Sequence, residues 1–563
     1  MMKFVTENKL LVFSFSLLAI SVLLHLMSYQ YPFVYEDEAL YLFFGKRDTV
    51  APDAGIVWKV LVSIGMFIFY GSEFKLIPLL FGLSGAFCFY LIIKRGLNLK
   101  TTSSLLLTVL YISSPIFYSQ AHRIRPEIVH VFFALCATSL YILTINNPKI
   151  NDLTSILKDK YFIIGTFCLL MVPHSHVMGV LHLPAIGLLL AYLFYSKTGS
   201  IKDSYVGLSI IAVLFFATLF ILLPGLLKNK LHHFDSFQTN TFTETLQKAW
   251  SMFTVAFRVW YGDLHNQEHI IWPKLFASGK HLRLEGLILY FLALLSCIFV
   301  VIRAFLSKAN SKQTLISCVA GINCICYLVA IVIFRRLNNS YNIILLPWML
   351  ISIASAFSQL DWKENIEPKI NKYWAKVVIC ALLFSFVISI VHNINFVFPL
   401  RKTNFNQLLT NLETELDRCE CKNVSTASTP YFIFLQEDNP LPILPFGDII
   451  AQNSIKTNPE GFRGAHLDTL NKEDSCVIVI ARNYYSYDWW GQYADSMGKL
   501  REILSKDFDE LAEISMPFYK NDPFYPRMKK NADFEYPMGA DTIYIGGKET
   551  IWIYKKKAPD QTM

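Results

Sequence analysis

Charged residues are scarce in this chain of 563 residues. Asp, Glu, Lys and Arg together make up 17% of it, hydrophobic residues make up 53%, and the mean hydropathy is +0.39. Soluble globular proteins carry about a quarter of their residues as charges. The shortage of charge therefore excludes a soluble protein and predicts a polytopic α-helical membrane protein.

Motifs for soluble nucleotides and for secretion are absent as well. The chain has no glycine-rich phosphate-binding loop and no dinucleotide fingerprint, so the sequence offers no nucleotide-binding site. No small-residue cleavage site follows the first apolar run, which ends in His25-Leu-Met-Ser-Tyr29. We therefore predict that this run is an uncleaved membrane anchor.

The excess of positive charge is small and scattered. The chain carries 51 Lys and Arg against 43 Asp and Glu, a formal net charge of +8. The positive residues are spread over loops instead of forming one basic block, and loop lysines are what membrane topology requires. We therefore predict membrane lipids as partners and no nucleic acid.

Long apolar runs dominate the first 400 residues. A transmembrane helix needs roughly 20 such residues, and about eleven runs qualify. The apolar stretch from Ile56 to Tyr70 contains Lys59, and we predict that it lies along the membrane surface. The predicted spans are about 10–29, 76–94, 101–121, 128–145, 161–173, 176–196, 205–227, 284–302, 313–334, 341–359 and 377–398.

Lysines in alternate loops define the predicted topology. They gather at residues 94–100, 149–160, 197–202, 308–312 and 363–376, and such loops belong inside by the positive-inside rule. The transmembrane domain is therefore predicted at 1–399, with loops 30–75 and 228–283 on the outer face. The tail, 400–563, follows on the same outer face.

The tail has the composition of a small α/β domain. Short β-rich runs occur at Tyr431–Leu435, Cys476–Ile480 and the hairpin-like Asp541–Tyr554, and 488–504 is predicted to be a helix. In an extracytoplasmic tail, Cys476 could pair with either Cys419 or Cys421.

Three consecutive carboxylates, Glu36-Asp37-Glu38, lie just beyond the first apolar run. Carboxylates beside a span are costly unless they face water, bind a cation or take part in chemistry. In a partly dehydrated cleft, a carboxylate can act as a general base toward an attacking hydroxyl. The alternative is a solvated acidic loop.

Arginines in the first 400 residues are distributed unlike the lysines. Only Arg95 and Arg303 fall in the predicted inner loops. Guanidinium is favoured where phosphate or carboxylate is bound through two hydrogen bonds, so the outward excess predicts an anion site on the outer face. The alternative is that these arginines pair with nearby carboxylates, Glu127 included, or contact lipid head groups. The outer arginines are Arg47, Arg123, Arg125, Arg258, Arg283, Arg335 and Arg336.

Two short segments hold most of the predicted anion contacts. In His122-Arg-Ile-Arg-Pro-Glu127, Arg123 and Arg125 could hold a phosphate. Pro126 would start the next helix, with Glu127 in its first turn, where a carboxylate suits the helix dipole. The second segment contains Arg335, Arg336 and Tyr341, and Lys46 and Arg47 are further candidates.

Histidines offer only a weak metal hypothesis. His174, His176 and His182 could hold a divalent cation, but their spacing around a proline matches no recognised ligand pattern. No cofactor is predicted.

The ordered motifs resemble those of membrane glycosyltransferases of the GT-C fold. More narrowly, they are similar to the branch with the dolichyl-phosphate-mannose protein mannosyltransferases and the bacterial lipid A aminoarabinose transferase. The resembling residues are Asp37-Glu38 followed by Ala-Leu-Tyr41, the run Gly71–Pro78, Arg125-Pro-Glu127, and Arg336, Tyr341 and Pro347.

This resemblance implies inverting transfer of one sugar from a polyprenyl-phosphate donor to an acceptor hydroxyl or phosphate on the non-cytoplasmic face. Asp37 would be the base, Glu38 its supporting acid and Glu127 a second acid of the cleft. The donor phosphate would be held by Arg123, Arg125, Arg335 and Arg336. The host membrane would be a bacterial inner membrane.

Two other functions are alternatives to glycosyl transfer. A transporter or flippase for an anionic lipid-linked sugar could also place arginines outside and acids near the membrane. Many transporters show matched halves with broken helices, and no such repeat is present in this sequence. A sensor or assembly subunit would leave the arginine and carboxylate loops without a role.

Overall fold

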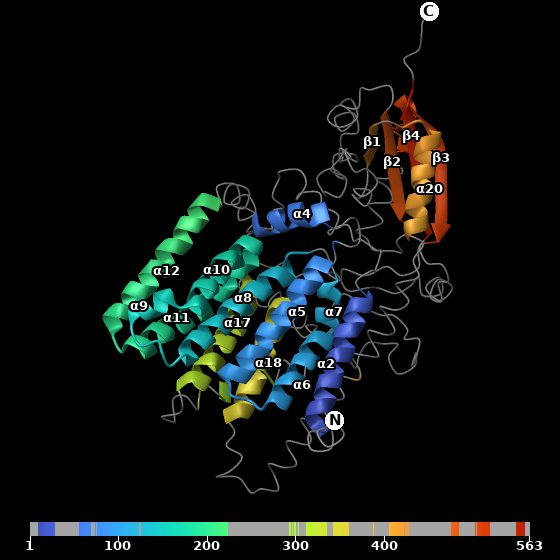
Figure 1. The fold of residues 1–563 in the computed structure, drawn as a ribbon. Helices are drawn as coiled ribbons and strands as arrows, with labels where there is room; N and C mark the ends of the chain where they lie inside the picture. The colour runs from blue at the N-terminus through green and yellow to red at the C-terminus, as the bar shows by residue number, and fades with distance from the viewer. Residues whose placement is uncertain are drawn as a thin grey trace, which may run out of the picture.

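A helical bundle and a four-stranded sheet make up the described part of the computed structural model (Figure 1). It describes residues 9–28, 56–68, 74, 76–122, 125–222, 311–334, 342–359, 405–421, 423–426, 475–482, 501–502, 504–517 and 548–557, with isolated positions between 292 and 302 and at 387.

Helices hold most of the described residues among the first 400 positions. They are α2 (Lys9–Ser28), α4 (Ile56–Ile68), α5 (Leu76–Leu91), α6 (Thr101–Ser113), α7 (Pro115–Ala121), α8 (Glu127–Asn146), α9 (Leu153–Lys158), α10 (Lys160–Ser175), α11 (Leu183–Thr198), α12 (Ile201–Leu222), α17 (Ser311–Phe334) and α18 (Asn342–Gln359). A π-helical turn, η2 (Ile92–Gly96), extends α5, and a 3-10 helix, η3 (Val177–His182), leads into α11.

Several of these helices have the length and composition of membrane spans. Within the described ranges, four helical stretches are long and apolar enough to cross a bilayer: Leu76–Gly96, Glu127–Asn146, Met178–Thr198 and Ile201–Thr218. Shorter apolar helices lie at Leu11–Leu26, Ile56–Gly65, Thr101–Ser113 and Ile343–Ala356. Most of the predicted spans 284–302 and 377–398 lies outside the described residues, so the total of about eleven spans stays a prediction.

Helix α8 is the centre of the bundle. It packs against α5, α10, α11 and α18, and its buried side chains run from Glu127 to Thr144. Small residues permit the close approach: a Cβ on Gly82 of α5 would lie 3.3 Å from Ile128, and one on Gly165 of α10 would lie 3.1 Å from the Tyr141 ring. Membrane helices commonly use small residues in this way, because lipid gives them no hydrophobic drive to associate.

The predicted span 101–121 is wrong as a single helix. Ser114 is extended (ψ 141°), and its hydroxyl accepts a hydrogen bond from the Phe117 backbone at 3.2 Å. Pro115 follows at the first helical position, where its missing N–H costs nothing. A serine cap and a proline therefore divide the run into α6 and α7, although its apolar composition is continuous.

Lysine-bearing loops gather at one end of the bundle, as the sequence predicts. Lys312 Nζ donates to the carbonyl oxygen of Arg95 at 2.9 Å and to Asn146 Oδ1 at 2.7 Å. Lys197 Nζ donates to the carbonyl oxygen of Asn147 at 2.7 Å. These contacts bring the ends of α5, α8, α11 and α17 together, and we call this end of the bundle the lysine end.

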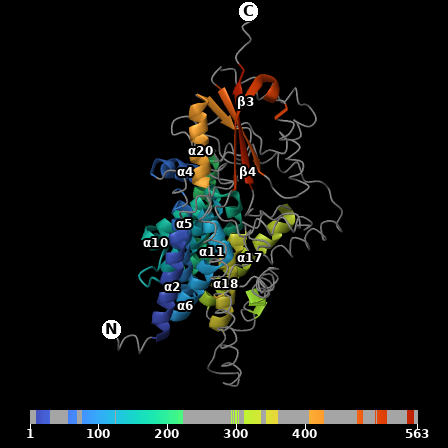
Figure 2. The same ribbon diagram turned by 90° about the vertical axis from the view of Figure 1, so that its right-hand side faces the viewer.

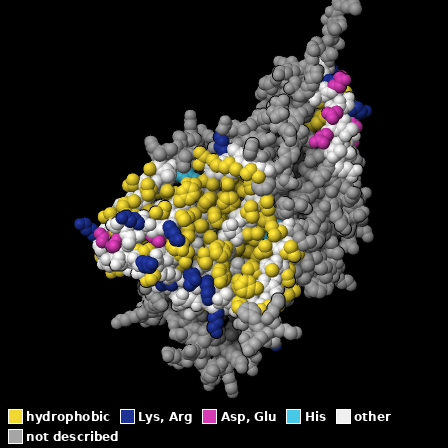
Figure 3. Space-filling view, viewed as in Figure 1, with side chains coloured by type: hydrophobic (Ala, Val, Ile, Leu, Met, Phe, Trp, Pro, Cys, Tyr) yellow, Lys and Arg dark blue, Asp and Glu magenta, His cyan; other side chains and the backbone are white. Residues whose placement is uncertain are grey.

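The opposite end carries α4, which lies across the bundle at a steep angle to α5 and α8 (Figure 1). Trp58 and Val62 are buried against the bundle, whereas Val60, Ile64 and Ile68 are exposed. An apolar outer face on a helix in this orientation is typical of an interfacial helix. Figure 3 shows the broad apolar surface of the bundle, with Lys and Arg along its margin.

In the tail, a mixed sheet has the strand order β1-β2-β4-β3. Its strands are β1 (Asn423–Thr426), β2 (Ser475–Arg482), β3 (Phe508–Pro517) and β4 (Lys548–Lys556), and α20 (Phe405–Arg418) packs beside it (Figure 2). Leu412 of α20 and Ile478, Ile551 and Ile553 of the sheet form a common apolar core.

Two predicted features of the tail agree with the sheet and one does not. The run Cys476–Ile480 lies in β2, and Cys476 is bonded to Cys421, which decides between the two candidate partners. The second half of the predicted β-rich run Asp541–Tyr554 forms β4, but the hairpin pairing is wrong, because β4 pairs with β2 on one edge and with β3 on the other. The run Tyr431–Leu435 lies outside the described residues, and the extent and membrane side of the domain stay predictions.

Candidate functional site

The structure describes two of the predicted site residues, Arg125 and Glu127. The others lie outside the described residues: Asp37, Glu38, Lys46, Arg47, Arg123, Arg335, Arg336 and Tyr341.

Arg125 and Glu127 form a buried ion pair at the start of α8. Arg125 Nε lies 3.1 Å from Glu127 Oε1, and the two side chains are 6% and 0% exposed. Pro126 occupies the N-cap position, so Glu127 is the first residue of the helix and its charge lies at the positive end of the helix dipole. For Arg125 the structure therefore shows the pairing with Glu127 that was the alternative to an anion site. A guanidinium has five N–H donors, so an anion contact through its terminal nitrogens stays a prediction.

The corner before α8 is tied to the first helix by a pair of buried histidines. His25 of α2 places Nδ1 3.0 Å from His122 Nε2, and its Nε2 lies 2.8 Å from the carbonyl oxygen of Ile112. The hydroxyl oxygen of Ser21, one turn earlier on α2, lies 3.0 Å from that of Ser113, and the two hydroxyls form a hydrogen bond. The first helix is therefore joined to α6 and to the corner by polar contacts inside an apolar bundle.

A second group of histidines lies one turn further along α8 than the ion pair. His130 is one turn along α8 from Glu127, and its ring centroid is 5.2 Å from that of His176 and 5.6 Å from that of His182. His130 was not predicted from the sequence, although a histidine inside an apolar helix is by default a functional candidate.

This second group does not have the geometry of a metal centre. His176 Nδ1 accepts a hydrogen bond from the Met178 backbone at 3.1 Å, so in a neutral ring its Nε2 carries the proton and offers no lone pair to a metal. His182 Nδ1 lies 2.8 Å from Asn323 Oδ1. Within the ranges that the structure describes, no three His, Cys, Asp or Glu residues are placed to hold a metal ion.

Three chain segments that carry predicted site residues connect helix ends at the same end of the bundle. His25 lies in the last turn of α2 and contacts His122. Helix α17 starts at the lysine end, so its last residue, Phe334, lies at the other end, where α8 begins. Helix α18 begins at the same end, and its Trp348 ring lies 5.6 Å from the His182 ring. The end of α2, the start of α8, the end of α17 and the start of α18, which flank these three segments, thus lie at one end of the bundle.

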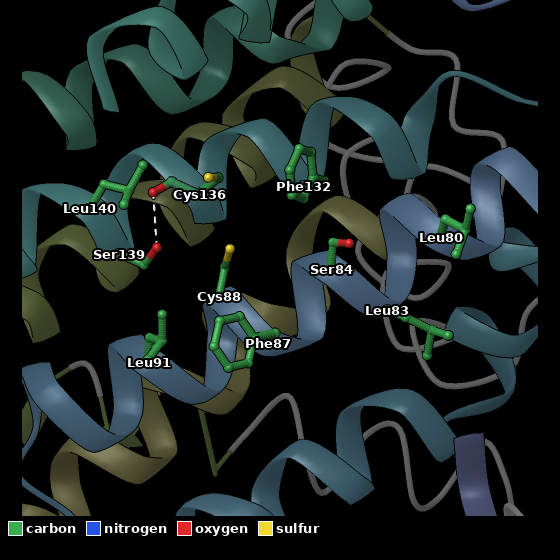
Figure 4. Close-up of a pocket in the computed structure, with 10 residues that line it drawn as sticks. All are labelled: Leu80, Leu83, Ser84, Phe87, Cys88, Leu91, Phe132, Cys136, Ser139 and Leu140. Atoms are coloured by element: carbon green, nitrogen blue, oxygen red, sulfur yellow. Dashed lines mark hydrogen bonds between the residues drawn. The ribbon is translucent and has the colours of Figure 1, made fainter. Parts of the chain in front are cut away.

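A groove of about 500 Å³ runs between α5 and α8 (Figure 4). Its lining is mostly apolar, with the thiols of Cys88 and Cys136 and the hydroxyls of Ser84 and Ser139 as its polar side-chain groups. Phe87 is 61% exposed at its margin. None of its lining residues is charged, so the groove suits an apolar occupant and is separate from the ion pair.

No protein-family model and no curated protein sequence matches this chain. Solved structures do match it. ArnT from Cupriavidus metallidurans in the apo state gives a TM-score of 0.53 at 12% identity, over 88% of this chain and 95% of that chain. The same protein bound to undecaprenyl phosphate gives 0.52 with the same identity and coverage. An oligosaccharyltransferase from Archaeoglobus fulgidus gives 0.52 at 11% identity, over 88% of this chain and 73% of that chain.

Both neighbours are membrane glycosyltransferases of one fold class. The chain has the GT-C fold. At this level of identity the similarity establishes the architecture of this GT-C protein, an α-helical membrane protein, and its activity has to be argued from its own residues.

Proposed function

We propose that this GT-C protein transfers one sugar from a polyprenyl-phosphate donor to an acceptor hydroxyl or phosphate, with inversion at the sugar. The buried Arg125–Glu127 pair supports the proposal, because it supplies a guanidinium and a carboxylate at the end of the bundle opposite the lysine end. The ArnT neighbour has been solved with undecaprenyl phosphate, which is the class of lipid that the proposed donor would release.

A single displacement accounts for the chemistry. The acceptor oxygen loses its proton to the Asp37 carboxylate and forms a bond to the anomeric carbon. The bond from that carbon to the phosphate oxygen breaks, and the electron pair leaves with the polyprenyl phosphate. Attack and departure on opposite faces invert the anomeric centre. The phosphate gains negative charge in the transition state, and preorganised guanidinium groups stabilise that charge without proton transfer.

The chain has residues for each role. Asp37 follows the end of α2 by nine residues, which span at most about 30 Å when extended, so the carboxylate is within reach of the corner beside His25. Glu38 would support the base and Glu127 would be the second acid of the cleft. The donor phosphate would be bound by Arg123, Arg125, Arg335 and Arg336, with Lys46, Arg47 and Tyr341 as further contacts.

The cellular setting belongs to the same proposal. The reacting groups and the tail would lie on the periplasmic side of a bacterial inner membrane. The Cys421–Cys476 disulfide supports this side for the tail, because disulfides persist in oxidising compartments and are rare in the cytosol. The acceptor would be a lipid, glycan or protein of the envelope.

Mass analysis of envelope lipids and glycoproteins from cells with and without the gene tests the proposal directly. We expect one class of product that is lighter by a single sugar when the gene is deleted. Complementation with Asp37→Asn should fail, whereas the matched variant Glu36→Gln should restore the product, because Glu36 is the carboxylate without a proposed role. Restoration by Asp37→Asn would remove Asp37 as the base. An unmodified but mislocalised lipid-linked sugar would instead support a flippase.

A further inference from the structure

The hydrogen bonds of His25 determine which of its nitrogens carries a proton. A carbonyl oxygen only accepts, so His25 Nε2, 2.8 Å from the Ile112 oxygen, is the donor. A neutral imidazole has one N–H, so His25 Nδ1 is an acceptor. His122 Nε2, 3.0 Å away, must then donate. The bond therefore has one direction, from His122 to His25.

The ring geometry agrees with this direction. The two ring planes are inclined by only 9° and their centroids are 5.2 Å apart. That separation is too large for face-to-face contact of two rings joined by a 3.0 Å N···N distance, and it fits rings that lie edge to edge in one plane. Phe117 contacts the side of His25 with a centroid distance of 5.3 Å at 79°. His25 is 1% exposed and His122 8% exposed, so water does not compete for the bond.

The position of His122 gives the bond its consequence. His122 ends α7, and Arg125 and Glu127 follow within five residues. Pro126 restricts the backbone between them. The corner is thus held on one side by the first turn of α8 and on the other by the bond to α2, which is itself joined to α6 through Ile112 and Ser113.

We propose that the His122–His25 hydrogen bond positions the corner between α7 and α8, whose described residues are His122, Arg125 and Pro126, so that the Arg125 guanidinium lies where a polyprenyl phosphate binds. His122 is a positioning residue in this account, since it acts through the corner and is not required to touch the lipid. The inference rests on the proposed function for the identity of the ligand. The bond itself can be tested without it.

Binding of undecaprenyl phosphate to the full-length protein in nanodiscs measures the functional part. His122→Leu removes the donor and should raise the Kd about tenfold or more, since loss of one hydrogen bond to a charged group corresponds to roughly a tenfold change in affinity or more. His122→Gln places an N–H donor near the position of Nε2 and should stay within about threefold of wild type. Ser21→Ala is the matched control, because it removes a buried hydrogen bond of the same helix and leaves the contacts of His25 with His122 and Ile112 in place.

Two outcomes would overturn the inference. One is a Kd for His122→Leu equal to that of Ser21→Ala. The other is an equal loss of binding in His122→Leu and His122→Gln, which would show that the imidazole itself is needed and not its hydrogen bond.

Solid-state NMR of protein with ¹⁵N-labelled histidine, in the same nanodiscs, tests the bond separately. We expect a protonated Nε2 and a bare Nδ1 at His25, with the Nδ1 signal shifted in His122→Leu and nearly unchanged in His122→Gln. A protonated His25 Nδ1 in the wild type would refute the bond. If the wild type shows the expected tautomer but does not bind undecaprenyl phosphate, the proposed function fails while the assigned bond stands.

Discussion

Removing Arg125 should be the most destabilising single change among the described ion pairs. The Glu127 side chain is 0% exposed and that of Arg125 is 6% exposed. Deleting one partner of such a pair leaves a buried charge without compensation, which costs about 3–5 kcal/mol. The helix dipole still favours the carboxylate at the first position of α8 by about 0.3–1 kcal/mol. We therefore expect Arg125→Ala to lower the free energy of unfolding by about 2–4 kcal/mol.

An exposed pair in the tail supplies the control. Arg418 Nη2 lies 2.6 Å from Glu415 Oε2, closer than the two atoms of the buried pair, but the Arg418 side chain is 64% exposed. Exposed pairs contribute about 0.2–1 kcal/mol, because water screens the charges. Arg418→Ala should therefore cost less than about 1 kcal/mol, although its pair is the shorter one.

Denaturant unfolding in detergent micelles, followed by tryptophan fluorescence and far-UV circular dichroism, measures both variants. The double variant Arg125→Leu/Glu127→Leu should recover part of the loss, since it removes both buried charges together. Equal destabilisation by Arg125→Ala and Arg418→Ala would refute the reasoning, because burial would then not decide the strength of the pair. A double variant less stable than Arg125→Ala would contradict it as well.

Other expectations concern the tail. The Cys421–Cys476 disulfide closes a sequence separation of 55 residues, so Cys421→Ser should lower the free energy of unfolding of the tail by about 4 kcal/mol. Cys419→Ser removes an unbonded thiol, so the melting temperature of that variant should still fall when a reducing agent is added. Burial alone would raise the pKa of the Glu510 carboxyl, but hydrogen bonds from Tyr554 and Arg501 outweigh it and hold that pKa below the usual value of about 4.3 for a glutamate. The sheet should therefore lose stability as the pH falls below about that value, and Glu510→Gln should abolish this loss in circular dichroism melts. Burial raises the pKa of Tyr554 from 10.0 to about 12, so between these two pH values the unfolded state ionises first and stability should fall as the pH rises.

Apolar run length predicted most helix positions in the bundle. The runs at 10–29, 76–94 and 128–145 lie within a few residues of α2, α5 and α8, because a helix in lipid satisfies every backbone group internally. The break at Ser114 was not predicted, since a cap and a proline change the backbone without changing hydropathy. The edge strand β3 was not predicted from the sequence either. Its sequence, Phe508-Asp-Glu-Leu-Ala-Glu-Ile514, alternates too many charges to read as a buried strand.

The candidate site, like the fold, was predicted only in part from the sequence. The ion pair of Arg125 with Glu127 was named as an alternative from their proximity and from the topology. The histidine contacts could not be named, because His25 and His122 are 97 residues apart and only the packing of α2 against α6 brings them together. That the acidic loop and the 335–341 segment reach this corner stays a prediction.

The polar contacts of α2 also have a consequence for biosynthesis. Ser21 and His25 lie on α2, and their partners, Ser113 and His122, are synthesised 92 and 97 residues later. At about 5–20 residues per second, a ribosome needs roughly 5–20 seconds to deliver them. During that interval the first helix carries polar groups in lipid that only later helices can satisfy. Assembly of this protein therefore requires that α2 stays inserted until residues 113 and 122 have been synthesised. Slower translation of residues 29–122 should lower its yield.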